Sequence, residues 1–365
     1  MTRKILVVAV ALLVTCVGAA AQTKVDTANY AYTPKEWKHI VRQMPESFYS
    51  TAEAARIAEN VLAFQRGTGG WPKNIAMHKP LGDGMAAVLA DKDRRDDSTT
   101  DNDATTTEMT FLAKIWHHQP DERYLTAFRN GVEFLLDGQY DNGGWPQFWP
   151  ENRGYQVHIT YNDNAMAQTL CLIRDIRDGT APFDSLVDDS TIARLDTAFN
   201  KGIECILNTQ IIVNGQPTVW CQQHDRVTLA PAPARAFEPA AFCSAESASL
   251  VEILMSLPRP SGRVIAAVDG AMRWFDEHKL TGIRVERFTD SNGKPDTRVV
   301  NDSTAAPLWT RYYDLSTGQP LFSDRDGQPK RTLAEVSRER RAGYAWYSDA
   351  PAKLAKKYKK WKKKL

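Results

Sequence analysis

Apolar residues recur at helical spacing along most of the chain. Apolar positions three and four apart repeat through seven runs, many of them rich in the helix-favouring residues Ala, Leu, Glu and Met. These runs are Ala52–Phe64, Thr107–Trp116, Arg123–Leu136, Ala165–Ile176, Ile192–Ile206, Ser244–Leu257 and Val264–Glu277. Short β-branched runs such as Ile211–Val213 predict only small hairpins. The pattern therefore predicts a mainly α protein.

A repeated motif connects these predicted helices. The sequence Gln-x-x-x-Gly-Gly-Trp-Pro starts at Gln65 and again at Gln139, 74 residues later. A degraded third copy starts at Gln210 and ends at Trp220. The glycines would end a helix and turn the chain, and proline after tryptophan prevents the helix from resuming. This period fits repeated helical hairpins, so we expect a ring or barrel of helices with similar loops and a cleft at one end.

Acidic and amide residues follow the first two turns. The segment 100–104 reads Thr-Asp-Asn-Asp-Ala, the segment 161–165 reads Tyr-Asn-Asp-Asn-Ala, and each precedes a predicted helix. Asp and Asn are common helix N-caps, and that interpretation stays open for either segment. Their equivalent places in successive repeats favour convergence of the side chains instead. Loop carboxylates and amides suit calcium rather than zinc or copper, although the spacing of an EF-hand is absent.

Arginines lie beside aromatic residues in three predicted loops. Arg235 follows a Pro-rich stretch and precedes Phe237, Arg311 stands within a Trp-Thr-Arg-Tyr-Tyr segment, and Arg325 follows Phe322. A planar guanidinium can bind a carboxylate through two hydrogen bonds, so these segments suit a cleft for acidic sugars. Ordinary surface salt bridging remains the alternative, above all for Arg325, which has an aspartate on each side.

Composition and charge narrow the class of protein. The chain of 365 residues is 42% hydrophobic and 25% charged, which is typical of a globular protein and excludes disordered or collagen-like chains. The last thirteen residues hold eight lysines, and residues 1–21 hold two cations and no acid. The segment between them carries 36 cationic and 44 acidic residues, so it is acidic. An acidic body with a basic end is not typical of a nucleic-acid-binding protein.

Residues 1–21 have the pattern of a cleaved secretory signal. Two cationic residues precede the apolar run Ile5–Val17, and small residues follow at Ala19–Ala21. The run is too short to span a bilayer comfortably, and no other stretch is apolar enough for a membrane span. We therefore expect a secreted or periplasmic protein, with a lipoprotein anchor at Cys16 as the alternative.

The rest of the chain is predicted to form one catalytic domain over residues 22–352 and a Lys-rich tail over residues 353–365. The tail is interpreted either as a solvated helix end or as an electrostatic tether to anionic surfaces. Four cysteines remain after removal of the signal, and their spacing matches no zinc pattern. Buried thiols are the favoured interpretation, and one disulfide is permitted.

Six segments together make the chain resemble the pectate lyases of the tenth polysaccharide lyase family, and the resemblance covers nearly the whole mature chain. These segments are Gly69–Asn74, Thr100–Thr105, Gly143–Phe148, Tyr161–Met166, Leu229–Pro239 and Pro307–Tyr313. The resemblance implies an incomplete (α/α) toroid that cleaves polygalacturonate, the backbone of pectin, by calcium-dependent β-elimination. We also expect a monomer.

The resemblance also implies roles for individual residues. By their position in the shared segments, Asp101 and Asp163 correspond to the Ca²⁺ ligands and Arg235 to the catalytic base. Arg311 and Arg325 correspond to residues that bind substrate carboxylates. Lys73 and Asn102 are carried over as further substrate-binding residues. Calcium and nearby cations would stabilise the negative charge that develops when a galacturonate loses its C5 proton.

Arginine is an unusual base, because its side chain is normally charged at every accessible pH. His224 or His158 would be a more conventional base on sequence grounds alone. The resemblance nevertheless ranks Arg235 first. Neighbouring cations would disfavour its charged form, and an alkaline working pH would help.

Two other functions fit the same pattern. A helical toroid with acidic loops also suits a glycoside hydrolase that uses two carboxylates on an acidic polysaccharide. A non-catalytic pectin-binding protein could use the same cations to hold uronates without reaction. A lyase product carries a double bond that absorbs ultraviolet light and a hydrolase product does not, so product analysis distinguishes the first alternative from a lyase. Turnover that a chelator abolishes would exclude the second alternative, a protein that only binds pectin.

Overall fold

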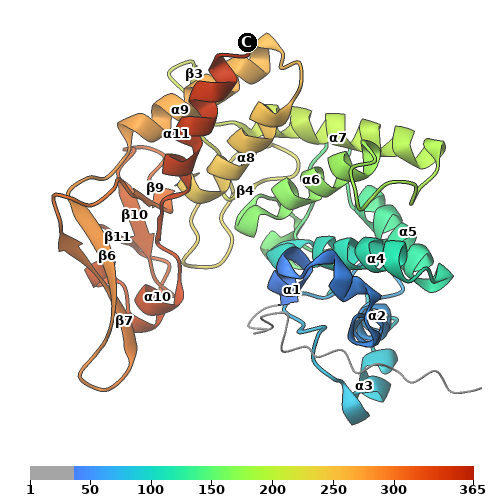
Figure 1. The fold of residues 1–365 in the computed structure, drawn as a ribbon. Coiled ribbons are helices and arrows are strands. Elements are labelled where there is room, and N and C mark those ends of the chain that lie inside the picture. Colours follow the sequence, from blue (N-terminus) through green and yellow to red (C-terminus); the bar gives the residue numbers. More distant parts are fainter. Residues whose placement is uncertain (1–36) are drawn as a thin grey trace, which may run out of the picture.

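The computed structural model describes residues 37–365. The predicted signal peptide, residues 1–21, and Cys16 lie outside the described residues. Helices dominate the described chain, as Figure 1 shows, and this confirms the mainly α prediction. All seven predicted runs are helices whose ends lie within three residues of the prediction. They are α2 (Ala52–Phe64), α4 (Thr106–His118), α5 (Glu122–Asp137), α6 (Ala165–Arg177), α7 (Asp189–Thr209), α8 (Ser244–Ser256) and α9 (Gly262–Glu277).

Several of these helices start where the sequence supplies a cap. The side chains of Thr51, Asp121, Asp188 and Ser261 each accept a backbone N–H in the first turn, which satisfies one of the donors that a helix start leaves unpaired. The capped helices are α2, α5, α7 and α9. Helices α4, α6 and α8 have no such side-chain cap, and their first turns lie instead beside the site described below.

The long helices form two series. Helices α4, α6 and α8 contact one another in succession, and so do α2, α5, α7 and α9. Within each repeat a helix of one series packs on a helix of the other, as in the pairs α4–α5, α6–α7 and α8–α9. Figure 1 shows them following an arc from α2 through α4–α7 to α8 and α9. Repeated helical hairpins, as expected from the period, therefore build this part of the molecule.

The glutamine and the tryptophan of the repeated motif make equivalent hydrogen bonds in all three copies. The indole N–H groups of Trp71, Trp145 and Trp220 donate at 2.7 Å to the carbonyl oxygens of Val61, Leu135 and Ile206. Each motif glutamine donates one bond to the loop that follows it. It donates a second to a helix of the next repeat, at Ala127 for Gln65, Ala198 for Gln139 and Ala267 for Gln210. We call these three glutamines and three tryptophans the Gln–Trp frame.

Glycine is required in the first two copies of the motif. Gly69 and Gly143 have φ of +90° and +89°, in the region that favours glycine. A Cβ at Gly69 would lie 2.3 Å from the carbonyl oxygen of Asn130, and one at Gly143 would lie 2.0 Å from that of Lys201. Any larger residue would therefore push the turn away from the neighbouring helix.

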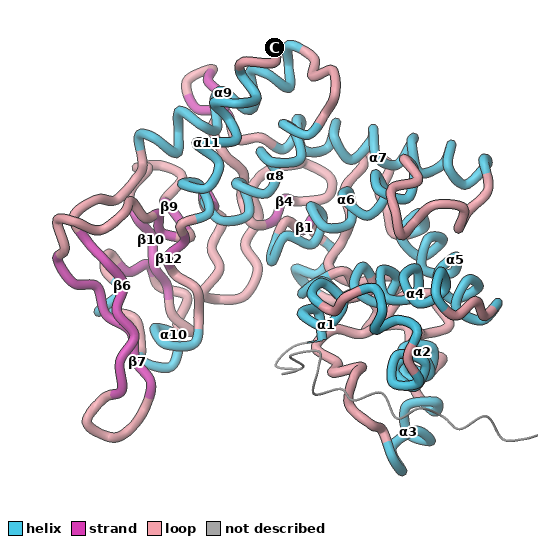
Figure 2. The backbone as a smooth tube through the Cα atoms, in the orientation of Figure 1, coloured by secondary structure: helices cyan, strands magenta, loops and turns pink. Residues whose placement is uncertain are grey.

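Strands are short in the first two thirds of the chain and longer near the C-terminus. Figure 2 shows the longer strands beside the helical arc and several of the short ones among its helices. The strands are β1 (Ile159–Thr160), β2 (Ile212–Val213), β3 (Gln216–Pro217), β4 (Gln223–His224), β5 (Phe242–Cys243), β6 (Ile283–Thr289), β7 (Pro295–Asn301), β8 (Trp309–Thr310), β9 (Tyr312–Tyr313), β10 (Pro320–Ser323), β11 (Pro329–Lys330) and β12 (Tyr347–Ser348). The hairpin β2–β3 confirms the small hairpin expected at Ile211–Val213.

The small hairpins expected from the sequence include a longer one, formed by β6 and β7. These strands pair over seven residues each, from Ile283 opposite Asn301 to Thr289 opposite Pro295. Their sequences mix charged and apolar residues, because most side chains of the hairpin are partly or fully exposed. A second sheet has the strand order β11-β10-β9-β5. This sheet brings Arg311, which precedes β9, next to the start of α8.

Short helices complete the described chain. They are α1 (Trp37–Gln43), α3 (Met85–Ala90), α10 (Arg338–Gly343) and the 3₁₀ turns η2 (Glu46–Ser50), η3 (Gly82–Gly84), η4 (Asp101–Asp103), η5 (Gly154–Val157), η6 (Asn162–Asn164) and η7 (Leu333–Glu335). One hydrophobic cluster runs through all the long helices and includes the three frame tryptophans. A smaller cluster fills the space between the β5–β9–β10 strands and Trp346.

The Lys-rich segment belongs to the last helix, α11 (Ala350–Lys362), which packs on α8 and α9. Leu354 and Trp361 of α11 are buried in the main hydrophobic cluster. Cys171, Cys205, Cys221 and Cys243 are free thiols, in line with the favoured interpretation. Within residues 37–365, no helix has the length and apolar character that crossing a membrane would need.

Candidate active site

The two Asp-Asn segments form matching turns at one end of the inner helices. They fold as η4 and η6, which contact each other before α4 and α6 begin. Both contain non-glycine residues with positive φ, including Asn102 at +55° and Asp163 at +50°. Residues held in this region are uncommon and mark positions where surrounding contacts fix the backbone. Neither Asp101 nor Asp163 caps a helix with its side chain, so the N-cap interpretation does not describe them.

Asp101 is a buried carboxylate with several partners. Its Oδ2 accepts hydrogen bonds from the Lys73 ammonium and, at 2.9 Å, from Gln147 Nε2. Its Oδ1 lies 3.4 Å from Asn162 Nδ2. The same Asn162 nitrogen donates to Asp163 Oδ2 at 3.1 Å. Asn162 therefore links the two aspartates of successive repeats.

Arg311 connects this pair to helix α8. It donates at 3.1 Å to Asn162 Oδ1, lies 3.4 Å from Asp163 Oδ1, and forms a close ion pair with Glu246 in the first turn of α8. Burial alone would lower the pKa of Arg311, but the Glu246 carboxylate together with Tyr312, Tyr344 and Cys243 outweighs this and the pKa is raised. We call Asp101, Asn162, Asp163, Glu246 and Arg311 the carboxylate cluster.

Asp163 is the most open member of the carboxylate cluster, with 40% of its side chain exposed. Burial raises its pKa, the Arg311 guanidinium opposes this, and the nearby Glu246 and Asp101 carboxylates raise it further. Negative charge is therefore in excess at this point of the surface. A cation at Asp163 would relieve that excess.

Arg235 lies in the loop between β4 and β5 and faces the cluster across a tyrosine. Its guanidinium is paired with the buried Glu238, with Nε 2.7 Å from Oε2. Tyr344 donates to Glu238 Oε1 at 2.8 Å, and its ring lies 6.0 Å from the Arg235 guanidinium and 4.8 Å from that of Arg311. The Glu238 pairing raises the pKa of Arg235. Among the described residues, no hydrogen bond or ion pair joins Arg235 to Asp101 or Asp163.

The remaining predicted residues lie at three places. Lys73 lies within the site, on Asp101. Arg325 is exposed, pairs with Glu339 at 3.0 Å and shares the ring of Phe237 with Arg235. Asn102 points away from the carboxylate cluster and donates to Asn74 at 3.1 Å. The structure thus brings Lys73, Asp101, Asp163 and Arg311 together, with Arg235 beside them, and places Arg325 and Asn102 at the periphery.

Neither of the histidines considered as a base is a member of the carboxylate cluster. His224 is fully buried, its Nε2 accepts from the backbone of Cys221 at 3.1 Å, and its Nδ1 lies 2.9 Å from the Leu229 carbonyl. Burial lowers the pKa of His224 to about 4. His158 lies 3.7 Å from Asp225 at the side of the site. His224 is therefore a structural residue with both ring nitrogens in use.

The donor set at the cluster fits calcium. Asp101, Asp163, Asn162 and Gln147 offer only oxygen ligands, and the Gln147 carbonyl oxygen Oε1 is buried without a hydrogen-bond partner. Over residues 37–365 there is no group of three or more His, Cys, Asp or Glu side chains arranged to hold a metal. Two carboxylates completed by amides, water or substrate oxygens would therefore make up such a site.

Four residues of this site were missed from the sequence. Asn162 and Gln147 stand inside segments that carry the family resemblance, next to the residues that were chosen. Glu246 reads as an ordinary acid in the first turn of a helix, and Glu238 stands three residues after Arg235 in the same loop. Arg311, the partner of both Asn162 and Glu246, is 149 and 65 residues away from them, so no local signal marks these two residues.

A helical repeat fold whose loops gather carboxylates and guanidinium groups suits a protein that binds an acidic polysaccharide. Comparison with known proteins identifies the family. The profile of the pectic acid lyase family matches residues 65–355. This chain therefore belongs to the pectic acid lyase family, as the sequence resemblance implied, and is a polysaccharide lyase.

Two solved structures resemble the whole fold. One is a family 10 polysaccharide lyase from Cellvibrio cellulosa, with 33% identity and a TM-score of 0.74, covering 86% of this chain and 94% of that one. The other is a mutant of a family 10 lyase from the same organism in complex with trigalacturonic acid. It is 32% identical, has a TM-score of 0.74, and covers 87% of this chain and 97% of that one. The likeness confirms the incomplete (α/α) toroid. Comparison with the curated proteins finds no match.

Proposed function

We propose that this chain is a secreted pectate lyase that cleaves polygalacturonate by calcium-assisted β-elimination. Family membership and the trigalacturonic acid bound to a similar enzyme support the substrate class. The observation that carries the proposal is the position of Asn162, which bonds to both Asp101 and Asp163 while Arg311 bonds to Asn162. Two carboxylates and a guanidinium thus converge at one place, where a cation and a uronate can meet.

The reaction breaks the C5–H bond of a galacturonate and the bond from C4 to the glycosidic oxygen. A double bond forms between C4 and C5, a base takes the C5 proton, and the leaving oxygen takes a proton from an acid or from water. Negative charge develops at the carboxylate next to C5 during proton removal. Positive groups fixed at that carboxylate therefore lower the barrier, and each factor of ten in rate needs about 1.4 kcal/mol.

Arg311 is held in place for this role. Its pairing with Glu246 and its bond to Asn162 fix the guanidinium, so little reorganisation is needed when charge develops. Asp101 and Asp163 would hold the calcium ion, with Asn162 and Gln147 as further oxygen donors. When bound, calcium supplies a second positive charge at the uronate carboxylate. Lys73 donates a hydrogen bond to Oδ2 of Asp101, so its positive charge partly neutralises that carboxylate.

Arg235 is proposed as the base that takes the C5 proton. Its side chain is 45% exposed, so a substrate can reach the guanidinium from outside the protein. The Glu238 pairing opposes deprotonation, because it raises the pKa of Arg235. We therefore expect activity to increase with pH into the alkaline range, where the small neutral fraction of Arg235 grows.

Product analysis with and without calcium tests the proposal. The purified protein is incubated with polygalacturonate at alkaline pH, first with calcium and then with a chelator. We expect products that absorb in the ultraviolet in the first case and little turnover in the second. Saturated products would indicate a glycoside hydrolase, and binding without turnover in either case would indicate a pectin-binding protein.

The second part of the proposal is secretion. It rests on the pattern of residues 1–21, which resembles a cleaved signal. N-terminal sequencing of the protein exported from its host should begin near Gln22. A start at Cys16 with an attached lipid would replace secretion by anchoring.

A further inference from the structure

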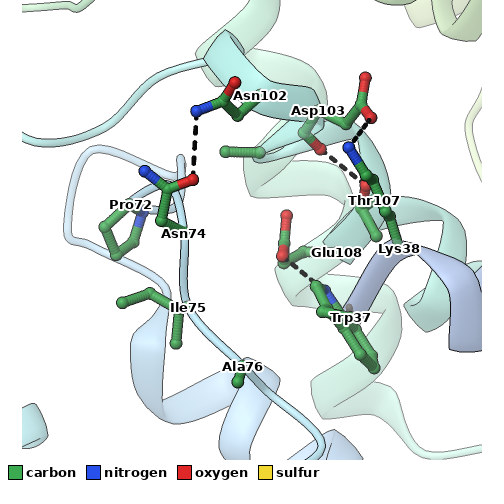
Figure 3. A pocket seen from close by; sticks show the side chains of 11 residues that line it. Trp37, Lys38, Pro72, Asn74, Ile75, Ala76, Asn102, Asp103, Thr107 and Glu108 are labelled. Atoms are coloured by element: carbon green, nitrogen blue, oxygen red, sulfur yellow. Dashed lines mark hydrogen bonds and ion pairs between the residues drawn. The ribbon is translucent and has the colours of Figure 1, made fainter. Parts of the chain in front are cut away.

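A pocket of about 400 Å³ is lined in part by the chain neighbours of Lys73 and Asp101. Figure 3 shows its lining, which includes Trp37, Asn74, Ile75, Ala76, Asn102 and Glu108. Lys73 and Asp101 belong to the cluster side, whereas their chain neighbours Asn74 and Asn102 line the pocket. Two residues of the lining are thus next in the chain to residues of the proposed active site, and the volume of the pocket falls within the range of small-molecule sites. We call it the Glu108 pocket.

Glu108 presents an unpaired oxygen to this pocket. The residue is 2% exposed, and its Oε1 accepts a hydrogen bond from the indole of Trp37 at 2.7 Å. Its Oε2 is buried and has no hydrogen-bond partner among residues 37–365. In Figure 3 that second oxygen points away from Trp37 toward the open centre of the pocket. An orphaned buried carboxylate oxygen is costly, so a ligand that bonds to it would relieve the cost.

The position of Glu108 in the first turn of α4 offsets only part of the cost of burying its carboxylate. A carboxylate there interacts favourably with the helix dipole. Burial raises its pKa to about 7, although nearby backbone N–H groups and the Trp37 indole act in the opposite direction. The side chain can therefore accept a hydrogen bond when ionised or donate one when protonated.

The rest of the lining matches a sugar ring. Asn102 donates to Asn74, which leaves the Asn74 amide nitrogen and the Asn102 carbonyl oxygen to bond hydroxyl groups at the mouth. Ile75 and Ala76 supply an apolar wall on the same side as Asn74, facing Glu108 and Trp37. Apolar surface combined with a few placed polar groups is typical of sites that bind small ligands such as sugars.

The charges of the lining favour an uncharged ligand. Lys38 is the cation among the lining residues, and it lies 3.7 Å from Asp103, which also pairs with Arg42 at 3.1 Å. The lining thus offers two acids and one cation that is already engaged. The carboxylate cluster contains Arg311, and Lys73 pairs with its Asp101. With a calcium ion bound there as proposed above, the cluster would attract a uronate carboxylate, whereas an ionised Glu108 would repel one.

We propose that the Glu108 pocket is a subsite for an uncharged sugar unit of the substrate, a methyl-esterified galacturonate next to the unit that is cleaved. This inference rests on the proposed function, because it assigns the neighbouring unit to the carboxylate cluster. The ester removes the charge that Glu108 would repel, and its methyl group can pack on Ile75 and Ala76. The hydroxyl groups of the ring satisfy Glu108 Oε2 and the two asparagines.

A pair of substrates and three variants test this subsite. The values of kcat/KM are measured on polygalacturonate and on partly methyl-esterified pectin. Ala76→Trp fills the pocket, Glu108→Gln replaces Oε2 while keeping an acceptor for Trp37, and Ala87→Trp adds the same ring on the exposed side of α3. We expect the first two variants to lose about tenfold on the esterified substrate relative to polygalacturonate, which is the worth of one well-made buried contact. Ala87→Trp should behave as the wild type.

Equal losses on both substrates, or no loss on either, would overturn the assignment. Absence of turnover by the wild-type enzyme would instead overturn the proposed function, and a binding measurement keeps the two failures apart. Calorimetric titration in chelator should show that the wild type binds methyl-esterified trigalacturonate and that Ala76→Trp does not. Tighter binding of the unesterified trimer, or of a neutral galactose trisaccharide, would contradict the ester subsite.

Discussion

The Gln–Trp frame and the carboxylate cluster differ in how their contacts are distributed along the chain. In the frame, each glutamine bonds to a loop within eight residues and to a helix 57 to 62 residues away, and the arrangement recurs three times. In the cluster, Arg311 bonds to Asn162 over 149 residues and to Glu246 over 65, and it occurs once. The frame repeats because it joins neighbouring hairpins. The cluster joins loops from hairpins that are far apart.

The two groups of residues therefore have different roles: the frame stabilises the fold, and the cluster serves the reaction. The frame glutamines and tryptophans are buried, or nearly so, and bond to backbone carbonyls, so they fix one hairpin against the next. The cluster holds ionised groups, and its Asp163 side chain is 40% exposed. Because water solvates this carboxylate, the folded protein can carry the excess negative charge. We expect changes in the frame to alter the free energy of unfolding and changes in the cluster to alter catalysis.

The largest effect is expected at Arg235. Arg235→Ala removes the proposed base and should lower kcat by roughly 10²–10⁴-fold, the usual contribution of a general base. Binding of polygalacturonate should remain largely intact, because Arg311 and the cluster are untouched. Initial rates measured by ultraviolet absorbance, together with calorimetric binding, provide the two readouts.

Two further variants make the Arg235 result interpretable. Arg235→Lys keeps a cation opposite Glu238, so it separates loss of the base from the cost of a buried unpaired carboxylate. Arg325→Ala removes an exposed arginine that pairs with Glu339 and should have a much smaller effect on kcat. Full activity of Arg235→Ala would remove this residue from the mechanism.

The next effect concerns calcium. Asp163→Asn removes the more open carboxylate of the cluster and should raise the calcium concentration for half-maximal activity by roughly 10–100-fold. Titrating calcium into chelator-treated enzyme measures it, with Asp141→Asn in an exposed loop as the control. An unchanged calcium requirement would show that the ion binds elsewhere.

A smaller effect is expected for the stability of the protein in acid. The pKa of His224 is about 4 in the folded protein and 6.5 as its ordinary value, so the unfolded chain binds the proton first. The stability contributed by neutral His224 is thus complete above about pH 6.5 and is lost as the pH falls toward 4. By pH 5 this amounts to about 2 kcal/mol.

Denaturant unfolding at several pH values measures the His224 effect. His224→Gln retains hydrogen-bonding groups without the titration, so its stability should depend less on pH between 6.5 and 4 than that of the wild type. Parallel pH curves for the two proteins would show that other groups cause the acid sensitivity.

The smallest effect tests the frame. Gln210→Ala removes bonds of 2.8 and 2.9 Å to Thr218 and Ala267, and should lower the free energy of unfolding by about 1–2 kcal/mol. Its kcat should match that of the wild type, with the exposed Gln216→Ala as the control. A loss of kcat without a loss of stability would contradict the assignment of the frame to stability and of the cluster to catalysis.

The frame and most helices could be predicted because local sequence determines them. Helical periodicity placed the seven long helices, and the Gly-Gly turns placed Trp71 and Trp145. The third copy looked degraded, yet Gln210 and Trp220 keep their bonds, because the frame depends on these two side chains and not on the glycines between them. The hairpin β6–β7 was missed because most of its side chains are exposed and carry little alternation.

The site was predicted only in part. Asp101 and Asp163 were found because they recur in equivalent turns, and Arg311 and Arg235 because of the family resemblance. Glu246 was missed because it becomes the partner of Arg311 only after segments 65 residues apart pack together. Glu238 lies only three residues from Arg235, but its pairing, which raises the pKa of Arg235, is visible only in the folded loop.

The central claim is that Asp101 and Asp163 hold a cation at the carboxylate of a galacturonate whose C5 hydrogen faces Arg235. A crystal structure of Arg235→Ala soaked with calcium and trigalacturonate tests it most directly. We predict calcium bound by both aspartates and by a substrate carboxylate, with C5–H directed at the space left by the missing side chain. Trigalacturonate bound elsewhere, or calcium away from these aspartates, would contradict the account.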